Sequence, residues 1–178
     1  MVPEKSGHDI SCPYESRPCI IFCFGRENLA PTLISACKSN GVVVKMKIDY
    51  QKLAQAAIDA KAMSYSPYSQ FQVGAALLTK DGKIYTGCNV ESAAFSPTNC
   101  AERTAIFKAV SEGYREFFAI AVAGSPKDAD PDYCYPCGVC RQVLREFATD
   151  DLTVIVVKTV TDYRIHKLGE LLPHSFGL

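Results

Sequence analysis

Apolar and polar residues follow two different periods from Tyr50 onward, and each period predicts one type of secondary structure. Leu53, Ala57 and Ala60 recur at the spacing of one helix face, and Ala56 widens the same stripe. The stripe stops before the next proline, which disfavours helical continuation. These positions predict an amphipathic helix at the start of the orderly part of the chain.

Short apolar segments after this helix predict the strands of a sheet. Residues 71–79 and 84–88 are β-like, and residues 80–83 between them contain an Asp-Gly dipeptide typical of tight hairpins. Residues 118–123 and 152–157 are apolar runs rich in β-branched residues, which predict buried strands. The chain is therefore expected to open its sheet with a hairpin and to add two buried strands later.

Helical patterns precede each of the two buried strands. Residues 101–111 and 138–149 have helical apolar spacing, and each stretch begins shortly after a proline, a residue that suits a helix entrance. Residues 163–166 could add an edge strand, and residues 168–172 a last helical turn. The order helix, hairpin, helix, strand, helix, strand, strand predicts an α/β sandwich with a mixed sheet.

The first 48 residues do not share this pattern. They combine several prolines and glycines with four cysteines whose spacings match no zinc motif. Acidic residues in this stretch also argue against an organellar transit peptide, because such peptides contain few acidic side chains. We expect residues 1–48 to form a weakly ordered N-terminal extension and residues 49–178 to form one folded domain.

Composition limits the classes of partner. The 178 residues, 48% of them hydrophobic, are enough for one full core but hardly for two. Nineteen basic side chains balance nineteen acidic ones, and no basic run is interleaved with aromatics, so we expect no nucleic-acid partner. The apolar run Cys19–Phe24 is too short to cross a membrane. We expect no membrane partner, a cytoplasmic location and reduced cysteines.

Three cysteines and one glutamate carry the candidate chemistry. Cys100 is followed by Glu102, and Cys137 and Cys140 form a C-x-x-C pair near the start of the next predicted helix. Two positions three residues apart in a first helical turn can converge on one ion, and helix N-termini favour thiolate over thiol. The spacing predicts that Cys100, Cys137 and Cys140 hold one Zn²⁺ per chain.

The number of ligands favours catalysis over structural support. A closed structural zinc site uses four protein ligands, whereas three leave one position for water. Glu102 beside Cys100 then supplies a carboxylate for proton transfer, although a glutamate in a first helical turn is more often an exposed surface acid. A zinc-stabilised nucleic-acid module is the rival, and it leaves both Glu102 and the missing fourth ligand without a purpose.

Five segments, in the same order, resemble the small homotetrameric cytidine deaminases. They are Phe71–Leu78, Gly87–Glu91, Cys100–Ala105, Pro136–Gln142 and Leu171–Phe176. The resemblance covers about residues 50–178 and implies a three-layer α/β/α fold, bound zinc, a nucleoside substrate and a homo-oligomer, most simply a tetramer.

The resemblance also implies a role for each site residue. Glu102 would shuttle protons, and Arg103 would donate a hydrogen bond to a ligating sulfur and so offset part of the thiolate charge that weakens the metal as a Lewis acid. Asn89 and Glu91, two residues apart at a strand end, could bind vicinal ribose hydroxyls together, although alone they would be ordinary strand-end polar residues. Phe71, otherwise a core aromatic, resembles the ring that stacks on the pyrimidine. The implied substrate-binding set is Phe71, Asn89, Glu91, Ala93, Phe95, Ala101 and Phe176, the last reaching a neighbouring subunit's site.

Two positions depart from the family pattern. Phe95 stands where the family often has tyrosine, so a hydroxyl contact is missing there. Cys134 forms a second C-x-x-C with Cys137, which permits ligand exchange in principle or leaves a spare thiol.

The predicted reaction is zinc-dependent hydrolytic deamination of cytidine and deoxycytidine to uridine and deoxyuridine, with release of ammonia, in pyrimidine salvage. A zinc deaminase of another cytosine-containing substrate, an antibiotic nucleoside or a polynucleotide, is the alternative. The pair Asn89 and Glu91 together with Phe176 favours a free nucleoside.

Overall fold

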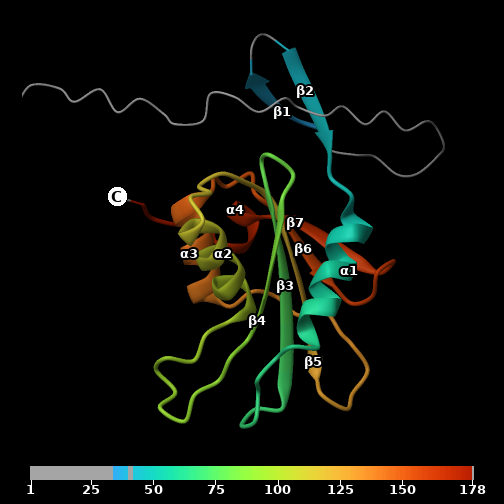
Figure 1. Ribbon diagram of the computed structural model, residues 1–178, viewed down its shortest axis with the longest axis vertical. Helices are drawn as coiled ribbons and strands as arrows, with labels where there is room; N and C mark the ends of the chain where they lie inside the picture. Colours follow the sequence, from blue (N-terminus) through green and yellow to red (C-terminus); the bar gives the residue numbers. More distant parts are fainter. Residues whose placement is uncertain (1–33, 40–41, 178) are drawn as a thin grey trace, which may run out of the picture. The chain divides into compact units, whose positions relative to one another are not determined.

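The computed structural model of the protein describes residues 34–39 and 42–177 (Figure 1). The elements in chain order are β1 (Ile34–Ser39), β2 (Val42–Lys47), α1 (Tyr50–Lys61), β3 (Phe71–Thr79), β4 (Ile84–Cys88), α2 (Ala101–Ser111), β5 (Phe117–Pro126), α3 (Gly138–Phe147), β6 (Thr153–Val157), β7 (Tyr163–Lys167) and α4 (Leu168–Leu171). From α1 onward this is the predicted order of helices and strands.

The main sheet has five strands in the order β4-β3-β5-β6-β7. β5 and β6 run parallel, and every other neighbouring pair is antiparallel, so the predicted mixed sheet is confirmed. The predicted hairpin joins β3 to β4, and Gly82 in its turn adopts a φ of 91°, a left-handed conformation that glycine adopts readily. The Thr79 hydroxyl closes this turn by accepting a hydrogen bond from the Lys83 amide at 2.9 Å.

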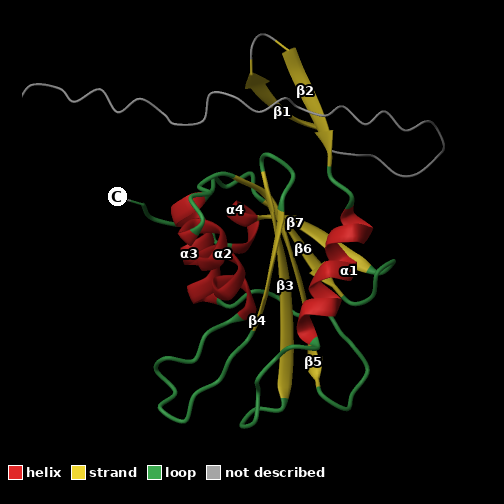
Figure 2. Ribbon diagram, viewed as in Figure 1, coloured by secondary structure: helices red, strands yellow, loops and turns green. Residues whose placement is uncertain are grey.

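Helices cover both faces of the sheet, which gives three layers (Figure 2). Alternate residues of the central strands enter two separate cores: Ile120 of β5 packs in the core that includes α2 and α3, while Ala121 packs in the core beneath α1. β3 and β6 alternate in the same way. This period of two is the expected consequence of strand geometry with both faces buried, and it confirms the predicted α/β/α sandwich.

Two glycines let the helices approach the sheet closely. A Cβ at Gly74 of β3 would lie 2.1 Å from the carbonyl oxygen of Ala57 in α1. A Cβ at Gly87 of β4 would lie 2.5 Å from the carbonyl oxygen of Ala101, the first residue of α2. Because α2 lies directly against β4, its N-terminal residues are fixed at one end of the sheet.

Some boundaries differ from the sequence prediction. β1 and β2 form an antiparallel pair in a stretch for which no strand was predicted, although Val42–Val44 is a β-branched run that favours one. β5 is longer than predicted and extends to Pro126, and α3 ends at Phe147. Most of the predicted extension lies outside the described residues, and the division at residue 48 stays a prediction. In the described ranges, no helix is long and apolar enough to cross a membrane.

Candidate metal centre and active site

The N-termini of α2 and α3 bring three cysteines together. Cys100 is the N-cap of α2, Cys137 is the N-cap of α3, and Cys140 lies in the first turn of α3. The Cys137 sulfur is 3.9 Å from that of Cys100 and 3.5 Å from that of Cys140, and all three sulfurs lie within 4.8 Å of one another. The convergence expected from the spacing is therefore present.

The three sulfurs fit a zinc ion. Zinc–sulfur bonds of about 2.3 Å in a tetrahedron separate the sulfurs by about 3.8 Å, close to the two distances above. Thiolates are soft ligands that select zinc over the oxygen-loving Mg²⁺ and Ca²⁺. Within the described part of the chain the cluster has three members and no fourth protein ligand. The site therefore has the ligand number of a catalytic zinc centre.

Hydrogen bonds and charge stabilise a thiolate at Cys100. A hydrogen bond from the Cys140 thiol, followed by the Arg103 guanidinium, lowers the pKa of Cys100 to about 5, and the same shared proton raises the pKa of Cys140. Arg103 Nη2 donates to the Cys100 sulfur at 3.5 Å and to the Thr98 carbonyl at 3.1 Å. The predicted contact between Arg103 and a ligating sulfur is therefore present.

Glu102 is buried and does not project into solvent as an ordinary first-turn acid would. Its exposed fraction is 3%. Burial, and then the negative charge of Cys100, raises the pKa of the Glu102 carboxyl to about 7. A carboxyl group that titrates near neutral pH can both accept and return a proton, as a general acid and base must.

Asn89 directly follows β4, and its side chain binds the beginning of β3. Its Oδ1 accepts hydrogen bonds from the Val73 amide at 2.8 Å and the Ser64 hydroxyl at 2.5 Å. Its Nδ2 donates to the Phe71 carbonyl at 2.8 Å. The sequence prediction for Asn89 is a sugar contact, and it missed these contacts with β3, which no local pattern reveals.

Glu91 performs a similar task for the turn before β3. Its Oε2 accepts hydrogen bonds from the backbone amides of Tyr68 at 2.9 Å and Ser69 at 3.2 Å. The Ser69 hydroxyl and these amides hold the pKa of Glu91 below its usual value, so the side chain is a carboxylate at neutral pH. Asn89 and Glu91 therefore hold neighbouring parts of the same segment, residues 64–73.

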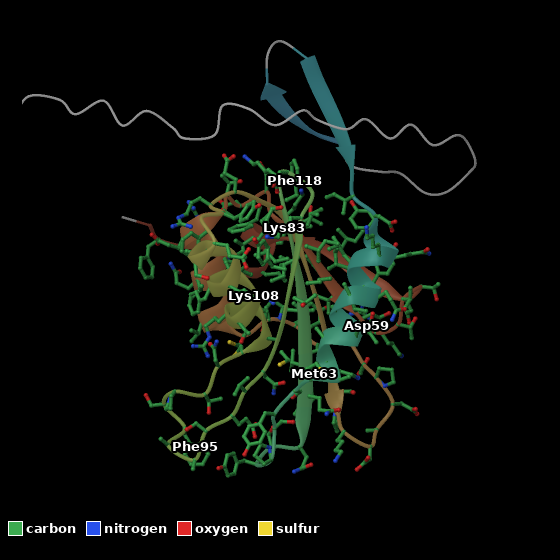
Figure 3. The ribbon with its side chains drawn as sticks, in the orientation of Figure 1. Asp59, Met63, Lys83, Phe95, Lys108 and Phe118 are labelled. Carbon is green, nitrogen blue, oxygen red and sulfur yellow. The ribbon has the colours of Figure 1, made fainter. Side chains whose placement is uncertain are left out.

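A hollow of about 390 Å³ lies between this turn and the loop that precedes α2. It is lined by Tyr68, Ser69, Glu91, Phe95 and Thr98. Phe95 has 72% of its surface exposed, lies at the tip of its loop (Figure 3), and meets the Tyr68 ring edge to face with 6.0 Å between centroids. Tyr68 and Ser69 were missed by the sequence prediction, although Pro67 and Ser69 on either side of Tyr68 are typical turn residues.

The remaining predicted residues fall into two groups. Phe71, the first residue of β3, is half-buried, and Ala101 is fully buried under β4. Ala93 is exposed on the same loop as Phe95. Phe176 is 70% exposed near the C-terminal end.

Side chains of α3 hold the C-terminal segment that carries Phe176. Arg141 donates to the Leu171 carbonyl at 2.7 Å, Gln142 to the Phe176 carbonyl at 3.0 Å, and Arg145 to the Ser175 hydroxyl at 3.2 Å. The backbone of Phe176 is therefore tied to the helix that supplies two metal ligands, while its ring stays free. These anchors were not predicted.

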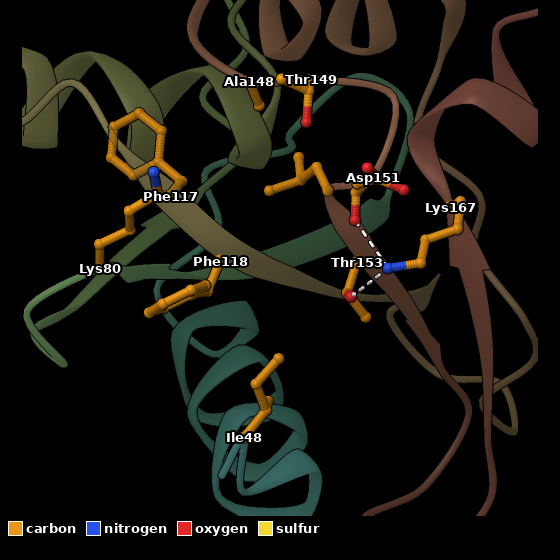
Figure 4. Close-up of a pocket in the computed structure, with 10 residues that line it drawn as sticks. Ile48, Lys80, Phe117, Phe118, Ala148, Thr149, Asp151, Thr153 and Lys167 are labelled. Carbon is orange, nitrogen blue, oxygen red and sulfur yellow. Dashed lines mark hydrogen bonds between the residues drawn. The ribbon is translucent and has the colours of Figure 1, made fainter. Parts of the chain in front are cut away.

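A second hollow, of about 350 Å³, lies at the N-terminal ends of β5 and β6 (Figure 4). Phe117, Phe118 and Thr153 line it, and the Lys167 ammonium is engaged there by the Asp151 carbonyl at 2.7 Å. Figure 3 places Phe118 and Phe95 at opposite ends of the sheet. Because the cysteine cluster and Glu102 do not line this hollow, it is separate from the candidate site.

Comparisons with known proteins agree with this site. The family described as "Cytidine and deoxycytidylate deaminase zinc-binding region" matches residues 47–156. A cytidine deaminase of Halalkalibacterium halodurans is 48% identical over 129 residues, covering 72% of this chain and 95% of the relative. The crystal structure of cytidine deaminase from Burkholderia pseudomallei superposes with a TM-score of 0.66 at 46% identity, covering 72% of this chain and 100% of that one. A blasticidin-S deaminase of Bacillus cereus is 32% identical over 134 residues, 70% of this chain and 90% of the relative.

Proposed function

The chain belongs to the cytidine and deoxycytidylate deaminase zinc-binding family, and from this premise we propose how its residues carry out the hydrolytic deamination of cytidine and deoxycytidine. The products are uridine or deoxyuridine and ammonia, a reaction of pyrimidine salvage. The observation that carries the proposal is a buried glutamate, Glu102, beside three cysteine sulfurs that fit one zinc ion.

Glu102 moves the protons of the reaction. Zinc held by the three sulfurs supplies the Lewis acidity that makes water a usable nucleophile at neutral pH. Glu102 takes a proton from the attacking water and delivers it to N3 of the ring as the bond to C4 forms. It then passes the second proton to the amino group, the C4–N bond breaks, and ammonia leaves. A pKa near 7 suits both directions of transfer.

Arg103 and the two helix N-termini offset the charge of the sulfurs. Three thiolates donate so much electron density that a bound metal becomes a weaker Lewis acid. The guanidinium of Arg103 on the Cys100 sulfur and the Cys140 amide on the Cys137 sulfur draw part of that charge away. Arg103 thereby supports the reaction without touching the substrate.

Asn89 and Glu91 keep free groups for the sugar. Glu91 uses Oε2 for both backbone amides, so its other oxygen, Oε1, can accept a hydrogen bond from a ribose hydroxyl. One Nδ2 hydrogen of Asn89 goes to the Phe71 carbonyl, which leaves the other for the sugar. Phe71 provides the ring that stacks on the base, and Ala93, Phe95 and Ala101 complete the contacts.

Phe176 completes the pocket of a neighbouring chain in a homotetramer. A phenylalanine with 70% of its surface exposed and its backbone held by Gln142 is presented outward, which supports a contact with another subunit.

Thiol ligands in this number require reducing conditions, which supports a cytoplasmic location.

An assay on the purified protein tests this function. Incubation with cytidine should lower the ultraviolet absorbance of the cytosine ring and release one ammonia for each cytidine converted. The protein should contain one zinc per chain. Blasticidin S and a cytosine-containing oligonucleotide, offered side by side, address the alternative substrates. Faster turnover of either one than of cytidine would replace the proposed substrate while leaving the zinc chemistry in place.

A further inference from the structure

Cys134 occupies space that a side chain at Gly124 would need. Gly124 lies in β5, paired with Val73 of β3, and the following loop folds back so that Asp132 forms a bridge to Gly124. A Cβ placed on Gly124 would lie 2.6 Å from the Cys134 sulfur and 2.9 Å from its Cβ. Both distances are too short for real atoms, so the thiol at 134 requires glycine at 124.

The ring of Phe71 shares this space. Its Cε1 atom lies 3.1 Å from the same point above Gly124. The ring edge and the Cys134 thiol are thus both packed over one backbone position. Sulfur against the edge of an aromatic ring is a favourable contact.

Cys134 is not explained by metal binding. It forms a C-x-x-C with Cys137, but the cluster found within the described residues contains Cys100, Cys137 and Cys140 only. Burial, with the negative charges of Glu102 and Cys100, raises the pKa of Cys134 to about 11. The side chain is therefore a neutral thiol that lies near Glu102 and Cys100 and outside the three-sulfur cluster.

We propose that Cys134 is a positioning residue for the pyrimidine: with Gly124 it forms the wall that fixes the Phe71 ring, and so sets the plane against which the base stacks. This inference rests on the proposed function, in which Phe71 contacts the base. Cys134 acts through Phe71 and does not touch the reacting atoms. It determines substrate affinity while leaving metal binding unchanged.

Paired substitutions in the full-length zinc-loaded protein test the inference. Cys134→Ala should raise KM for cytidine about 2- to 10-fold, the range of one sulfur–aromatic contact, with a smaller change in kcat and one zinc per chain. Cys134→Ser, whose hydroxyl is smaller than the thiol and cannot make the sulfur–aromatic contact, should raise KM to a similar extent, again with one zinc per chain. In a Phe71→Leu background, Cys134→Ala should have no further effect on KM.

Equal KM factors for Cys134→Ala in the wild-type and Phe71→Leu backgrounds would overturn the inference, because Cys134 would then act independently of the ring. Loss of zinc in Cys134→Ala would also overturn it and make Cys134 part of the metal site. Gly124→Ala should raise KM more strongly, and adding Cys134→Ala should reverse part of that rise, because the 2.6 Å contact is removed. A KM for the double variant no lower than that of Gly124→Ala alone would show that Cys134 does not occupy the space needed by a side chain at position 124, and would contradict the inference.

These outcomes remain distinct from failure of the proposed function. Absence of cytidine turnover by the wild-type protein would refute the function itself. An unchanged KM in Phe71→Leu alone would remove Phe71 from the base site and the inference with it, while leaving the zinc chemistry intact.

Discussion

The metal corner and the sugar-side rim of the site are built on opposite principles. The metal corner consists of Cys100, Cys137, Cys140 and Glu102. Cys140 and Glu102 are at most 3% exposed, whereas Cys100 is half-buried and Cys137 is exposed. The sugar-side rim, defined here as Glu91, Phe95, Phe176 and the turn at 68–69, exposes 72% of Phe95 and 70% of Phe176. In the proposed function, one chain completes the chemistry and a neighbouring chain completes the binding surface.

Local geometry explains the difference. Two helix starts hold the sulfur atoms of the metal corner, and close packing of α2 against β4 at Gly87 leaves no room for the start of α2 to move. The rim is held by hydrogen bonds to loop backbone, as at Glu91, and by the anchors of the C-terminal segment, as at Gln142. Loss of a corner residue should therefore abolish activity, whereas loss of a rim residue should weaken binding.

The largest effect is expected from removing a sulfur. Alanine at Cys100, Cys137 or Cys140 should remove zinc and activity together, because two remaining ligands cannot hold the ion in a tetrahedral site. Zinc per chain, measured by atomic emission, is the readout. Cys88→Ala is the matched control, since that thiol donates to the Met63 carbonyl and lies outside the cluster, and it should keep its zinc. Full zinc in all three variants would remove these cysteines from the metal site.

Glu102→Gln should lower kcat by about 10² or more while zinc and inhibitor binding persist. Glutamine keeps the size of the side chain but cannot carry a proton. Turnover, zinc content and the dissociation constant of a non-reactive cytidine analogue separate chemistry from binding. Near-normal turnover would place the proton shuttle on another residue.

Glu91→Ala should weaken ribose-containing inhibitors about 10- to 100-fold, the range for a hydrogen bond to a charged group. A free pyrimidine base should be affected much less, because a carboxylate directed at the sugar has nothing to contact there. Inhibition constants for matched pairs with and without ribose provide the measurement. Equal losses for both members of each pair would exclude Glu91 from the sugar site.

Gln142→Ala should have the smallest effect, a rise in KM of about 2- to 10-fold from one neutral hydrogen bond. The side chain holds the Phe176 carbonyl, so its loss loosens the segment without disturbing the Cys140 sulfur two residues away. Glu146→Ala, an exposed residue of the same helix, is the control and should leave KM unchanged. A lower zinc content in Gln142→Ala would mean that the residue supports the metal corner instead.

The same contrast governs what could be predicted from sequence. β3, β4 and α2 have the predicted bounds, because an Asp-Gly turn, a proline before a helix and alternating apolar residues act locally. The metal corner follows from a C-x-x-C at a helix start. The backbone contacts of Asn89, the role of Tyr68 in the hollow and the anchors on α3 join segments far apart in the chain, and no local pattern encodes such contacts. β1 and β2 were not predicted, because the prolines and cysteines of residues 1–48 outweighed the short valine run as a signal for strand.

Mixing a variant that lacks the proton shuttle with a variant that binds substrate weakly tests the central claim most directly. If one chain completes the chemistry and a neighbour completes the pocket, Glu102→Gln chains mixed with Phe176→Ala chains and allowed to exchange should form some pockets with both native residues. Those pockets should give cytidine turnover above the sum of the two separate parents. Turnover that stays at that sum after exchange, with mixed oligomers verified by mass spectrometry, would contradict the shared pocket.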